Sequence, residues 1–319
     1  MQVLAVATGF PASYRAVWSH VIHEGHEGAD AALTVWMVVP HRHPSRRLRH
    51  FSAPYNLDNM VAYDLLAAHY DAVTGDSATD TAFIVGLIKH ARGRAVTLLD
   101  VACGTGGVIA PLAARYQVSG LDISAGMLAV AREKLPEGTP LYLADMTSFE
   151  LNTAFDAVVC VYHGINHLLD FSDWESFFDC AYRHLNDGGV LIFDTITIDG
   201  LKMMARIPQT VQQFGDNYLL IRVRGSGKVV FDWDIEVFEL QPSGRYTLLT
   251  EVIRTASFPR ERIRKALGER FSNITTIDSD GGVVNGDGEN RTWFACTKPG
   301  REGPSRSPGG PVSGRHGVT

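Results

Sequence analysis

The residues best suited to chemistry lie in a glycine-rich segment, Asp100-Val101-Ala102-Cys103-Gly104-Thr105-Gly106-Gly107. The apolar run 96–101 leads into it and is typical of a buried parallel strand. Gly104 and Gly106 let the backbone approach a ligand closely, and the N-terminus of a following helix favours negative charge. A strand, a glycine-rich turn and a helix in this order predict a site for a nucleotide-containing cofactor.

The charge at this turn indicates which cofactor the site binds. A dinucleotide fingerprint needs G-x-G-x-x-G around a pyrophosphate, whereas Ala102 stands at the first glycine position and Asp100 precedes the loop. A carboxylate at Asp100 would repel a pyrophosphate and attract a methionyl ammonium group. The loop therefore favours S-adenosylmethionine (SAM) over NAD.

Acidic residues also end the next two predicted strands. Asp122 could accept hydrogen bonds from both ribose hydroxyls, and Asp145 could accept one from the adenine amino group. Met127 and Met146 flank these strand ends and could hold the adenine ring by soft apolar contacts, although core packing is their alternative role.

Titratable residues follow the fourth predicted strand. Methyl transfer from a sulfonium is an in-line displacement that depends on alignment and on exclusion of water, and an amine acceptor must be neutral when it attacks. His163 and His167 are the candidate bases, with Tyr162 and Asn166 as hydrogen-bonding side chains. His167 is either such a base or a histidine whose hydrogen bonds are satisfied at a helix start.

Strand and helix patterns alternate between about residues 96 and 194, which predicts a mainly parallel sheet covered on both faces. The capping box Ser172-Asp173-Trp174-Glu175 predicts the start of a helix, and Gly188 and Gly189 predict its end. Three period-2 segments then predict a three-stranded antiparallel insert. The remaining expected elements are helices at 79–90, 125–134 and 259–267 and strands at 118–121, 140–144, 155–161, 190–194, 273–278 and 292–297.

Taken together, residues 60–298 resemble the class I SAM-dependent methyltransferases. Leu98-Leu99-Asp100-Val101-Ala102-Cys103-Gly104-Thr105-Gly106 is similar to the first motif of that family, apart from Ala102, and the acid at Asp122 and Ala144-Asp145-Met146 follow as expected. The opening segment 63–71 and the insert resemble the branch that contains sugar-amine N,N-dimethyltransferases and glycine N-methyltransferase. The resemblance implies an α/β Rossmann-like fold with seven strands in the order 3-2-1-4-5-7-6, the last one antiparallel.

The same resemblance implies roles for single residues. In that branch a tyrosine matching Tyr70 reaches the SAM carboxylate, and the insert covers the acceptor site. His167-Leu168 resembles a His-Leu pair beside the acceptor nitrogen, whereas His163-Gly164 departs from the small hydroxyl residues found there. The candidate catalytic residues are Tyr162, His163 and His167. The candidate cofactor-binding residues are Tyr70, Asp100, Ala102, Cys103, Gly104, Gly106, Asp122, Ile123, Met127, Asp145 and Met146.

Composition and charge argue against several classes of function. The net charge is −6, and no basic stripe with interleaved aromatics occurs, which argues against nucleic-acid binding. No apolar run reaches the roughly 20 residues of a membrane span, and no secretory signal pattern opens the chain, so we expect a cytoplasmic protein. We expect no metal, because the histidines match no metal-binding spacing. Four arginines could clamp a substrate anion but are expected to be solvated strand residues: Arg222, Arg224, Arg254 and Arg291.

We therefore expect a SAM-dependent methyltransferase domain at 60–298, with cap helices at 60–95 and the insert at 209–258. Residues 1–59 are expected to be a poorly ordered extension, or the result of a start codon assigned upstream of Met60, and 299–319 to be a disordered tail. The expected reaction is methylation of a small molecule, foremost an amine. The alternatives are O-methylation of a hydroxyl or carboxylate and a module that binds SAM without turnover. Monomer and homodimer both remain open.

Overall fold

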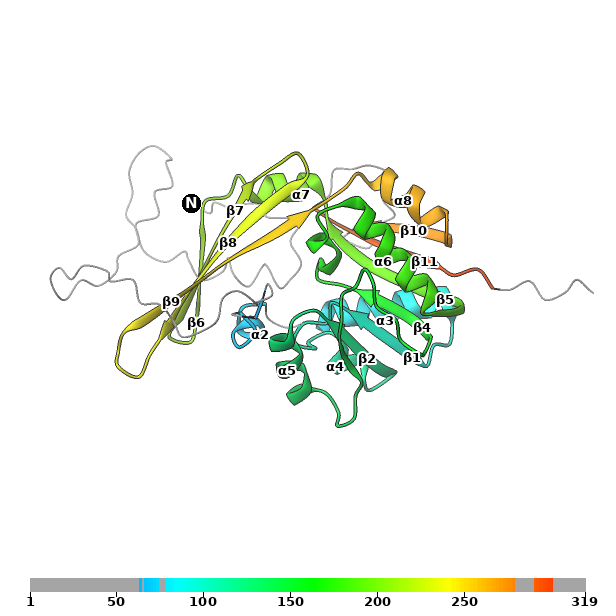
Figure 1. Ribbon diagram of the computed structural model, residues 1–319, viewed down its shortest axis with the longest axis horizontal. Helices are drawn as coiled ribbons and strands as arrows, with labels where there is room; N and C mark the ends of the chain where they lie inside the picture. The colour runs from blue at the N-terminus through cyan, green and yellow to red at the C-terminus, as the bar shows by residue number, and fades with distance from the viewer. Residues whose placement is uncertain (1–62, 65, 75–77, 279–289, 301–319) are drawn as a thin grey trace, which may run out of the picture.

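Two sheets organise the protein (Figure 1). The computed structural model describes residues 63–64, 66–74, 78–278 and 290–300. The expected extension at 1–59, and all of the expected tail except Pro299 and Gly300, lie outside the described residues. None of the helices within the described ranges combines the length and the hydropathy needed to cross a membrane.

The larger sheet has seven strands in the order β10-β11-β5-β4-β1-β2-β3. Numbered as seven consecutive strands this is 3-2-1-4-5-7-6, and β11 runs antiparallel to both of its neighbours, so the expected topology is confirmed. The strands are β1 (Thr97–Val101), β2 (Gln117–Asp122), β3 (Leu141–Leu143), β4 (Phe155–Cys160), β5 (Leu185–Ile196), β10 (Ser272–Asp278) and β11 (Arg291–Thr297).

Helices cover both faces of this sheet, because alternate side chains of each buried strand point to opposite sides. Leu98 packs in one apolar cluster and its neighbour Leu99 in the other, and both are fully buried. This two-sided burial explains why the neighbouring residues Leu98 and Leu99 of β1 are both apolar. The helices on the Leu98 face are α3 (Ala78–Arg92), α4 (Ile109–Leu112) and α5 (Ala125–Lys134), and those on the Leu99 face are α6 (Phe171–Arg183) and α8 (Arg260–Gly268).

The smaller sheet is antiparallel and has four strands rather than the three predicted. The additional strand β6 is short, and Gln212 and Gln213 give it no apolar alternation to recognise. Its register comes from a tight turn that pairs Phe214 with Asn217 of β7. The strands are β6 (Thr210–Phe214), β7 (Asn217–Gly225), β8 (Val230–Leu240) and β9 (Tyr246–Ala256).

The predicted boundaries of α6 are wrong at both ends. Ser172 lies inside the helix, and Asp170 is the N-cap residue, because Phe171 is drawn into the first turn by packing on Phe258 with ring centroids 5.1 Å apart. The helix ends at Arg183, so Gly188 and Gly189 belong to β5 instead. A Cβ at position 189 would lie 2.8 Å from a backbone oxygen, which explains the glycine there.

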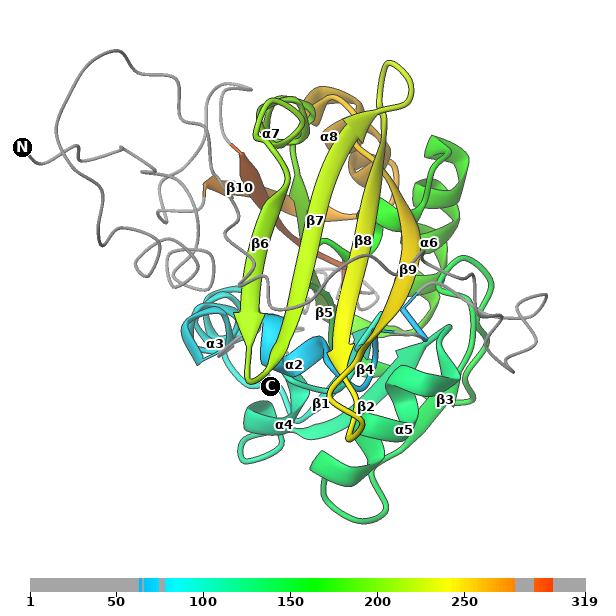
Figure 2. The same ribbon diagram turned by 90° about the vertical axis from the view of Figure 1, so that its left-hand side faces the viewer.

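Three short helices contact strands of the smaller sheet: α2 (Tyr70–Thr74), the 3-10 helix η2 (Gly164–His167) and α7 (Ile198–Met204). Figure 2 shows the four-stranded sheet standing in front of the larger sheet, with α7 near one end of it and α2 near the other. Helix α2 contacts β6, and η2 contacts β9. The chain between β4 and α6 is therefore in contact with both sheets.

Candidate functional site

The glycine-rich turn begins at a buried carboxylate. Asp100 is 1% exposed, and its Oδ1 has no hydrogen-bond partner in the described part of the chain. Burial, and next the negative charge of Asp122, raise the pKa of Asp100 well above its usual range. A buried carboxylate oxygen left without a partner is suited to a cationic group of a ligand.

Asp122 holds the turn in shape. Its Oδ2 accepts a hydrogen bond from the backbone N–H of Gly104 at 2.7 Å, and its Oδ1 accepts one from Ser124 at 2.9 Å. Burial raises the pKa of Asp122, and these backbone donors oppose the rise. A carboxylate oxygen can accept two hydrogen bonds, so the ribose hydroxyls remain predicted partners.

The loop itself needs positive φ angles. Gly104 and Gly106 have φ values of 54° and 75°, and Ala102 adopts 58° although it carries a Cβ. A Cβ at position 106 would lie 3.3 Å from the Cβ of Ala131 in α5. Cys103, between these residues, is buried and donates its backbone N–H to Leu121 of β2 at 3.0 Å.

Two apolar side chains are exposed at the carboxyl ends of β2 and β3. Ile123 is 50% exposed and Leu143 is 63% exposed, and the adjacent Asp122 pairs with Leu143 across the two strands. Ile123 was a predicted cofactor residue, whereas Leu143 was not, although its place at a strand end was visible in the sequence. Neighbouring exposed apolar side chains at this edge suit the flat face of an adenine ring.

The other predicted adenine contacts are placed differently. Met127 is only 3% exposed, inside α5, and Met146 is half-buried against the apolar cluster of the α6 face. Asp145 is exposed, and its Oδ1 accepts hydrogen bonds from the backbone N–H and the hydroxyl of Thr147, both at 2.8 Å. Its carboxylate is thus engaged in a local turn.

The N-terminal segment contacts the cofactor loop through acids that no sequence pattern pointed to. Asp71 accepts a hydrogen bond from the hydroxyl of Thr105 at 2.5 Å, and Asp64 accepts one from the hydroxyl of Ser124. Tyr70, beside Asp71, begins α2 and lines the cavity described next. These contacts fix the segment across the opening of the cofactor loop.

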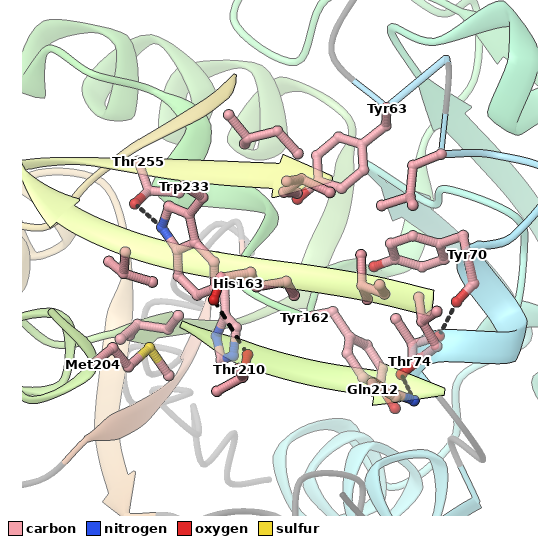
Figure 3. A pocket seen from close by; sticks show the side chains of 18 of the residues that line it. Tyr63, Tyr70, Thr74, Tyr162, His163, Met204, Thr210, Gln212, Trp233 and Thr255 are labelled. Atoms are coloured by element: carbon pink, nitrogen blue, oxygen red, sulfur yellow. Dashed lines mark hydrogen bonds between the residues drawn. The ribbon is translucent and has the colours of Figure 1, made fainter. Parts of the chain in front are cut away.

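A cavity of about 230 Å³ lies between this segment, η2 and the four-stranded sheet (Figure 3). Its wall is mainly aliphatic and aromatic, and its described lining residues include no Lys, Arg, Asp or Glu. Trp233 of β8 closes one side and donates its indole N–H to the hydroxyl of Thr255 at 2.9 Å. The polar lining residues are Tyr63, Tyr70, Thr74, Tyr162, His163, His167, Thr210, Gln212 and Thr255.

His167 faces the N-terminal segment. Its Nε2 lies 3.2 Å from the hydroxyl of Tyr63, and the two rings meet edge to face with centroids 5.3 Å apart. Burial lowers the pKa of His167 to about 4, although a hydrogen bond to the backbone of Arg254 opposes this. The ring is therefore neutral at pH 7.

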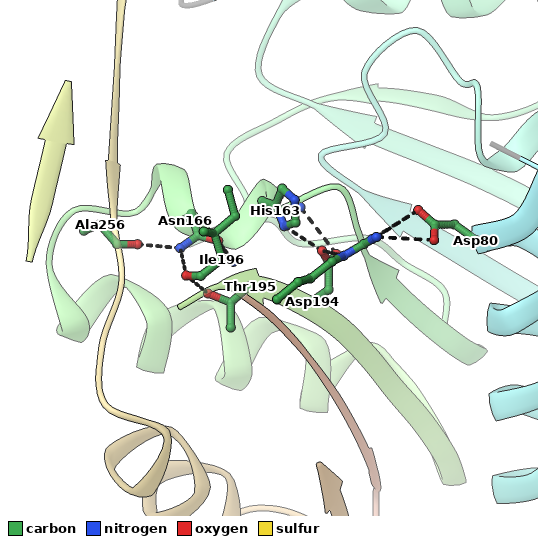
Figure 4. A network of polar contacts seen from close by, with 8 residues as sticks. Asp80, His163, Asn166, Asp194, Thr195, Ile196 and Ala256 are labelled. Carbon is green, nitrogen blue, oxygen red and sulfur yellow. Dashed lines mark hydrogen bonds and ion pairs between the residues drawn. The ribbon is translucent and has the colours of Figure 1, made fainter. Parts of the chain in front are cut away.

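His163 instead contacts a buried acid. Its Nδ1 lies 2.7 Å from Oδ2 of Asp194, which is fully buried at the end of β5 (Figure 4). Arg291 donates from Nε to the same carboxylate at 2.7 Å and from Nη2 to Asp80 at 3.1 Å. The hydroxyl of Tyr162 also hydrogen-bonds to Asp80, and burial raises the pKa of this tyrosine.

This network corrects one expectation and adds two residues. Arg291 is 4% exposed, so the expectation of a solvated side chain was wrong for it, whereas Arg222, Arg224 and Arg254 are exposed. Asp194 and Asp80 were not predicted. Asp194 could have been recognised in the sequence as an acid that follows an apolar run.

Asn166 was expected to hydrogen-bond in the site, but the structure assigns it another role. Its amide nitrogen donates to the carbonyls of Ile196 at 3.2 Å and Ala256 at 2.7 Å, and its Oδ1 accepts from the N–H of Ile196 at 3.0 Å. Asn166 is wholly buried, so it joins η2 to β5 and β9 and takes no part in the cavity wall.

Strained backbone concentrates where the cofactor loop meets the cavity wall. Tyr162 and His163 have φ values of 56° and 65°, in the left-handed region that Ala102 also adopts. A Cβ at position 164 would lie 2.9 Å from the Cβ of Ala102, so Gly164 permits this close approach. Such strain is typical of functional sites.

Residues 98–189 match a family model described as a methyltransferase domain. The chain is 32% identical over 143 residues to the dTDP-3-amino-3,6-dideoxy-alpha-D-glucopyranose N,N-dimethyltransferase of Streptomyces fradiae, a match that covers 44% of this chain and 54% of the relative. It is 31% identical over 144 residues to the dTDP-4-amino-2,3,4,6-tetradeoxy-D-glucose N,N-dimethyltransferase of Saccharopolyspora spinosa, covering 45% and 56%. The chain thus spans about half the length of the curated relatives it matches.

Solved structures match over a longer range. The sugar N-methyltransferase KedS8 from Streptoalloteichus sp ATCC 53650 aligns with a TM-score of 0.66 and 26% identity, over 80% of this chain and 100% of that one. A SAM-dependent methyltransferase from Clostridium acetobutylicum ATCC 824 has the same fold, with a TM-score of 0.66 at 22% identity over 75% of this chain and 100% of that one. Residues 98–189 thus form a methyltransferase domain, and the chain shares motifs and fold with the class I SAM-dependent methyltransferases, sugar N-methyltransferases among them.

Proposed function

We propose that this protein transfers the methyl group of SAM to the nitrogen of a small amine. The observation that carries the proposal is the contact between Gly164 and Ala102, which joins the cofactor loop to the segment whose His163 and His167 line the cavity. A methyl donor held by the loop and an acceptor held in the cavity would therefore meet along this wall. We also propose the domain bounds 60–298, with the insert at 209–258 over the acceptor.

The residues of the loop fit SAM. The orphan oxygen of Asp100 suits the methionyl ammonium, and Asp122 has acceptor capacity for the ribose hydroxyls. Ile123 and Leu143 provide an apolar surface for adenine. When bound, SAM supplies an electrophilic methyl group on a positively charged sulfur.

The cavity wall favours a neutral nitrogen. Because its described lining lacks carboxylates, an ammonium ion would lose its hydration there without a counter-charge. The same mainly apolar wall offers water few partners, which favours alignment of the acceptor with the methyl group. Tyr63, Tyr162 and the two histidines are the polar groups available to orient the acceptor.

Similarity supports an amino sugar as the class of acceptor. The curated relatives are named as N,N-dimethyltransferases of dTDP-linked amino sugars. The family model matches residues 98–189, which include the cofactor loop and both histidines but none of β6 to β9, the strands that supply much of the cavity wall. An amine is therefore the proposal, and the amino sugar is its first test compound.

The test is a methyl-transfer assay with the full chain. We expect S-adenosylhomocysteine (SAH) to form with dTDP-3-amino-3,6-dideoxy-α-D-glucopyranose or with phenethylamine, together with an acceptor heavier by one methyl group. The matched controls are dTDP-6-deoxy-D-glucose and phenylacetic acid, which offer a hydroxyl or a carboxylate instead. SAH formed only with these controls would show O-methylation, and SAM binding without SAH from any compound would show a binding module.

A further inference from the structure

We propose that His163 is the base that accepts the proton of the acceptor nitrogen, and that Asp194 positions it with the support of Arg291 and Asp80. The inference rests on the proposed function, because it assigns the proton acceptor of N-methylation. It also separates two histidines that the sequence places only four residues apart.

The position of His163 supports this role. Its side chain is 12% exposed and lines the acceptor cavity, while Nδ1 lies 2.7 Å from Asp194. Since Nδ1 faces the carboxylate, Nε2 is the ring nitrogen that remains for a ligand. The backbone N–H of His163 also donates to Oδ1 of Asp194 at 3.3 Å, so the main chain and the ring of His163 both contact the same carboxylate.

The Nδ1 contact is short but poorly aligned for a hydrogen bond, and Nδ1 has no other hydrogen-bond partner within the described residues. It is therefore an ion-pair contact that gains strength when the ring is protonated. Catalytic contacts of this kind are commonly misaligned before the substrate binds and tighten in the complex.

The charged side chains next to His163 carry an excess of one negative charge. Asp80 and Asp194 contribute two negative charges and Arg291 contributes one positive charge, so a protonated His163 balances the group. Burial acts to raise the pKa of Asp194, but Arg291 and His163 outweigh it and hold that pKa well below its usual range. Asp194 thus stays ionised, orients the ring and stabilises the imidazolium.

His167 lacks these properties. It is buried without a carboxylate, it lies beside Tyr63 and the backbone of Arg254, and the charge of His163 further disfavours its protonation. Its role is to position the Tyr63 hydroxyl at the cavity wall. The charged or titratable groups around His163 are Tyr63, Asp80, Tyr162, His167, Asp194 and Arg291.

The proton and electron balance is simple. Nε2 of His163 accepts one proton from the substrate ammonium, which leaves a neutral amine with its lone pair. That pair forms the C–N bond to the methyl carbon while the C–S bond breaks and its electrons stay on sulfur. The methylated product leaves as an ammonium ion with neutral SAH, and the imidazolium of His163 releases its proton to solvent.

The experiment compares wild type with His163→Asn between about pH 6 and 10. The probe is dTDP-3-amino-3,6-dideoxy-α-D-glucopyranose or phenethylamine, whichever gives more SAH with wild type. We expect kcat/KM at pH 7 to fall by about 10²- to 10⁴-fold in the variant. In the variant, log kcat/KM should then rise by one for each pH unit, because the rate follows the fraction of neutral amine. In wild type, log kcat/KM should reach a plateau. The two should converge near the pKa of the amine.

Three further variants make the comparison specific. His167→Asn should lower the rate yet keep the plateau, and His90→Asn, at an exposed position on α3, should leave the profile unchanged. Asp194→Asn should move the profile part of the way toward that of His163→Asn. Affinity for SAH, measured by calorimetry, checks that each variant is folded, and His163→Asn decides the inference if Asp194→Asn does not fold.

The outcomes of the two proposals are distinct. If wild type forms no SAH with either amine, the proposed function fails. If wild type is active but His163→Asn keeps its plateau, or if His167→Asn loses it, the assignment of His163 is overturned while N-methylation stands.

Discussion

Arg291 and Asp194 are 97 residues apart in sequence, yet Nε of Arg291 donates to Oδ2 of Asp194 at 2.7 Å between neighbouring strands of the larger sheet. Asp194 is 0% exposed and Arg291 is 4% exposed. A buried pair of this kind is stabilising only while both partners are present, because each charge has lost its hydration. The pair therefore links the stability of the fold to the geometry at His163.

Replacing Arg291 by Met should destabilise the protein. The change leaves Asp194 buried without its guanidinium, which costs about 3–5 kcal/mol of unfolding free energy. Urea unfolding at pH 7 measures the effect. Adding Asp194→Leu should recover part of the loss, because an apolar pair needs no hydration. Arg224→Met removes an exposed pair with Asp234 and should leave the midpoint unchanged. Equal effects of both Met variants would contradict the buried role.

Binding of SAH should weaken as the pH falls. Burial raises the pKa of Asp100, and the ligand ammonium requires its ionised form, so affinity is highest above that raised pKa. As the pH drops through it, affinity should fall by up to about tenfold per pH unit. Calorimetry between about pH 5 and 7.5 follows the trend. Asp100→Asn should bind weakly with a flatter profile, and Glu137→Gln, at an exposed position, should keep the wild-type slope.

Asp122→Ala should weaken SAM binding by about 10- to 100-fold. The variant loses the predicted ribose acceptor and also the two backbone hydrogen bonds that hold Gly104 and Ser124. Calorimetric titration gives the affinity, and the thermal unfolding temperature without ligand separates binding from folding. Wild-type affinity in a folded variant would refute the assignment.

The buried neutral ring of His167 should make stability depend on pH. Its pKa is about 4 in the folded protein, below the ordinary 6.5, so the unfolded chain binds the extra proton first. Stability should be complete above about pH 6.5 and decline toward pH 4, by up to about 3 kcal/mol in total. Urea unfolding at about pH 7.5 and 5 should show a smaller difference in His167→Asn than in wild type. The exposed His90→Asn should behave as wild type, and an unchanged slope in His167→Asn would argue against a neutral ring.

Asn166→Ala should affect the acceptor more than the cofactor. It leaves buried backbone groups of Ile196 and Ala256 without partners, which costs about 1–3 kcal/mol. Because these bonds fix η2 to β9, we expect a higher KM for the amine with nearly unchanged SAH affinity. Steady-state kinetics and calorimetry measure the two. Asn152→Ala, at an exposed position, is the control, and a loss of SAH affinity equal to the rise in KM would contradict the prediction.

Much of the larger sheet could be predicted because its determinants are local. Two-sided burial favours consecutive apolar residues such as 98–99 in β1 and 190–193 in β5. Ser124 caps α5 through a hydrogen bond from Met127 at 3.0 Å. The start of α6 and the strand β6 could not be predicted. Phe171 enters the helix through contacts made in the folded core, and β6 is defined by its pairing with β7.

The sequence by itself determined the cofactor loop and the acids that flank it, since Asp100 and Asp122 stand at strand ends whose order follows from local patterns. Only the tertiary structure decided between His163 and His167. Their chemistry depends on burial and on charges from Asp80, Asp194 and Arg291, and Arg291 and Asp80 are 211 residues apart along the chain. A histidine has no fixed proton affinity of its own in a protein, because desolvation and neighbouring charges set it, and neither is present until the chain has folded.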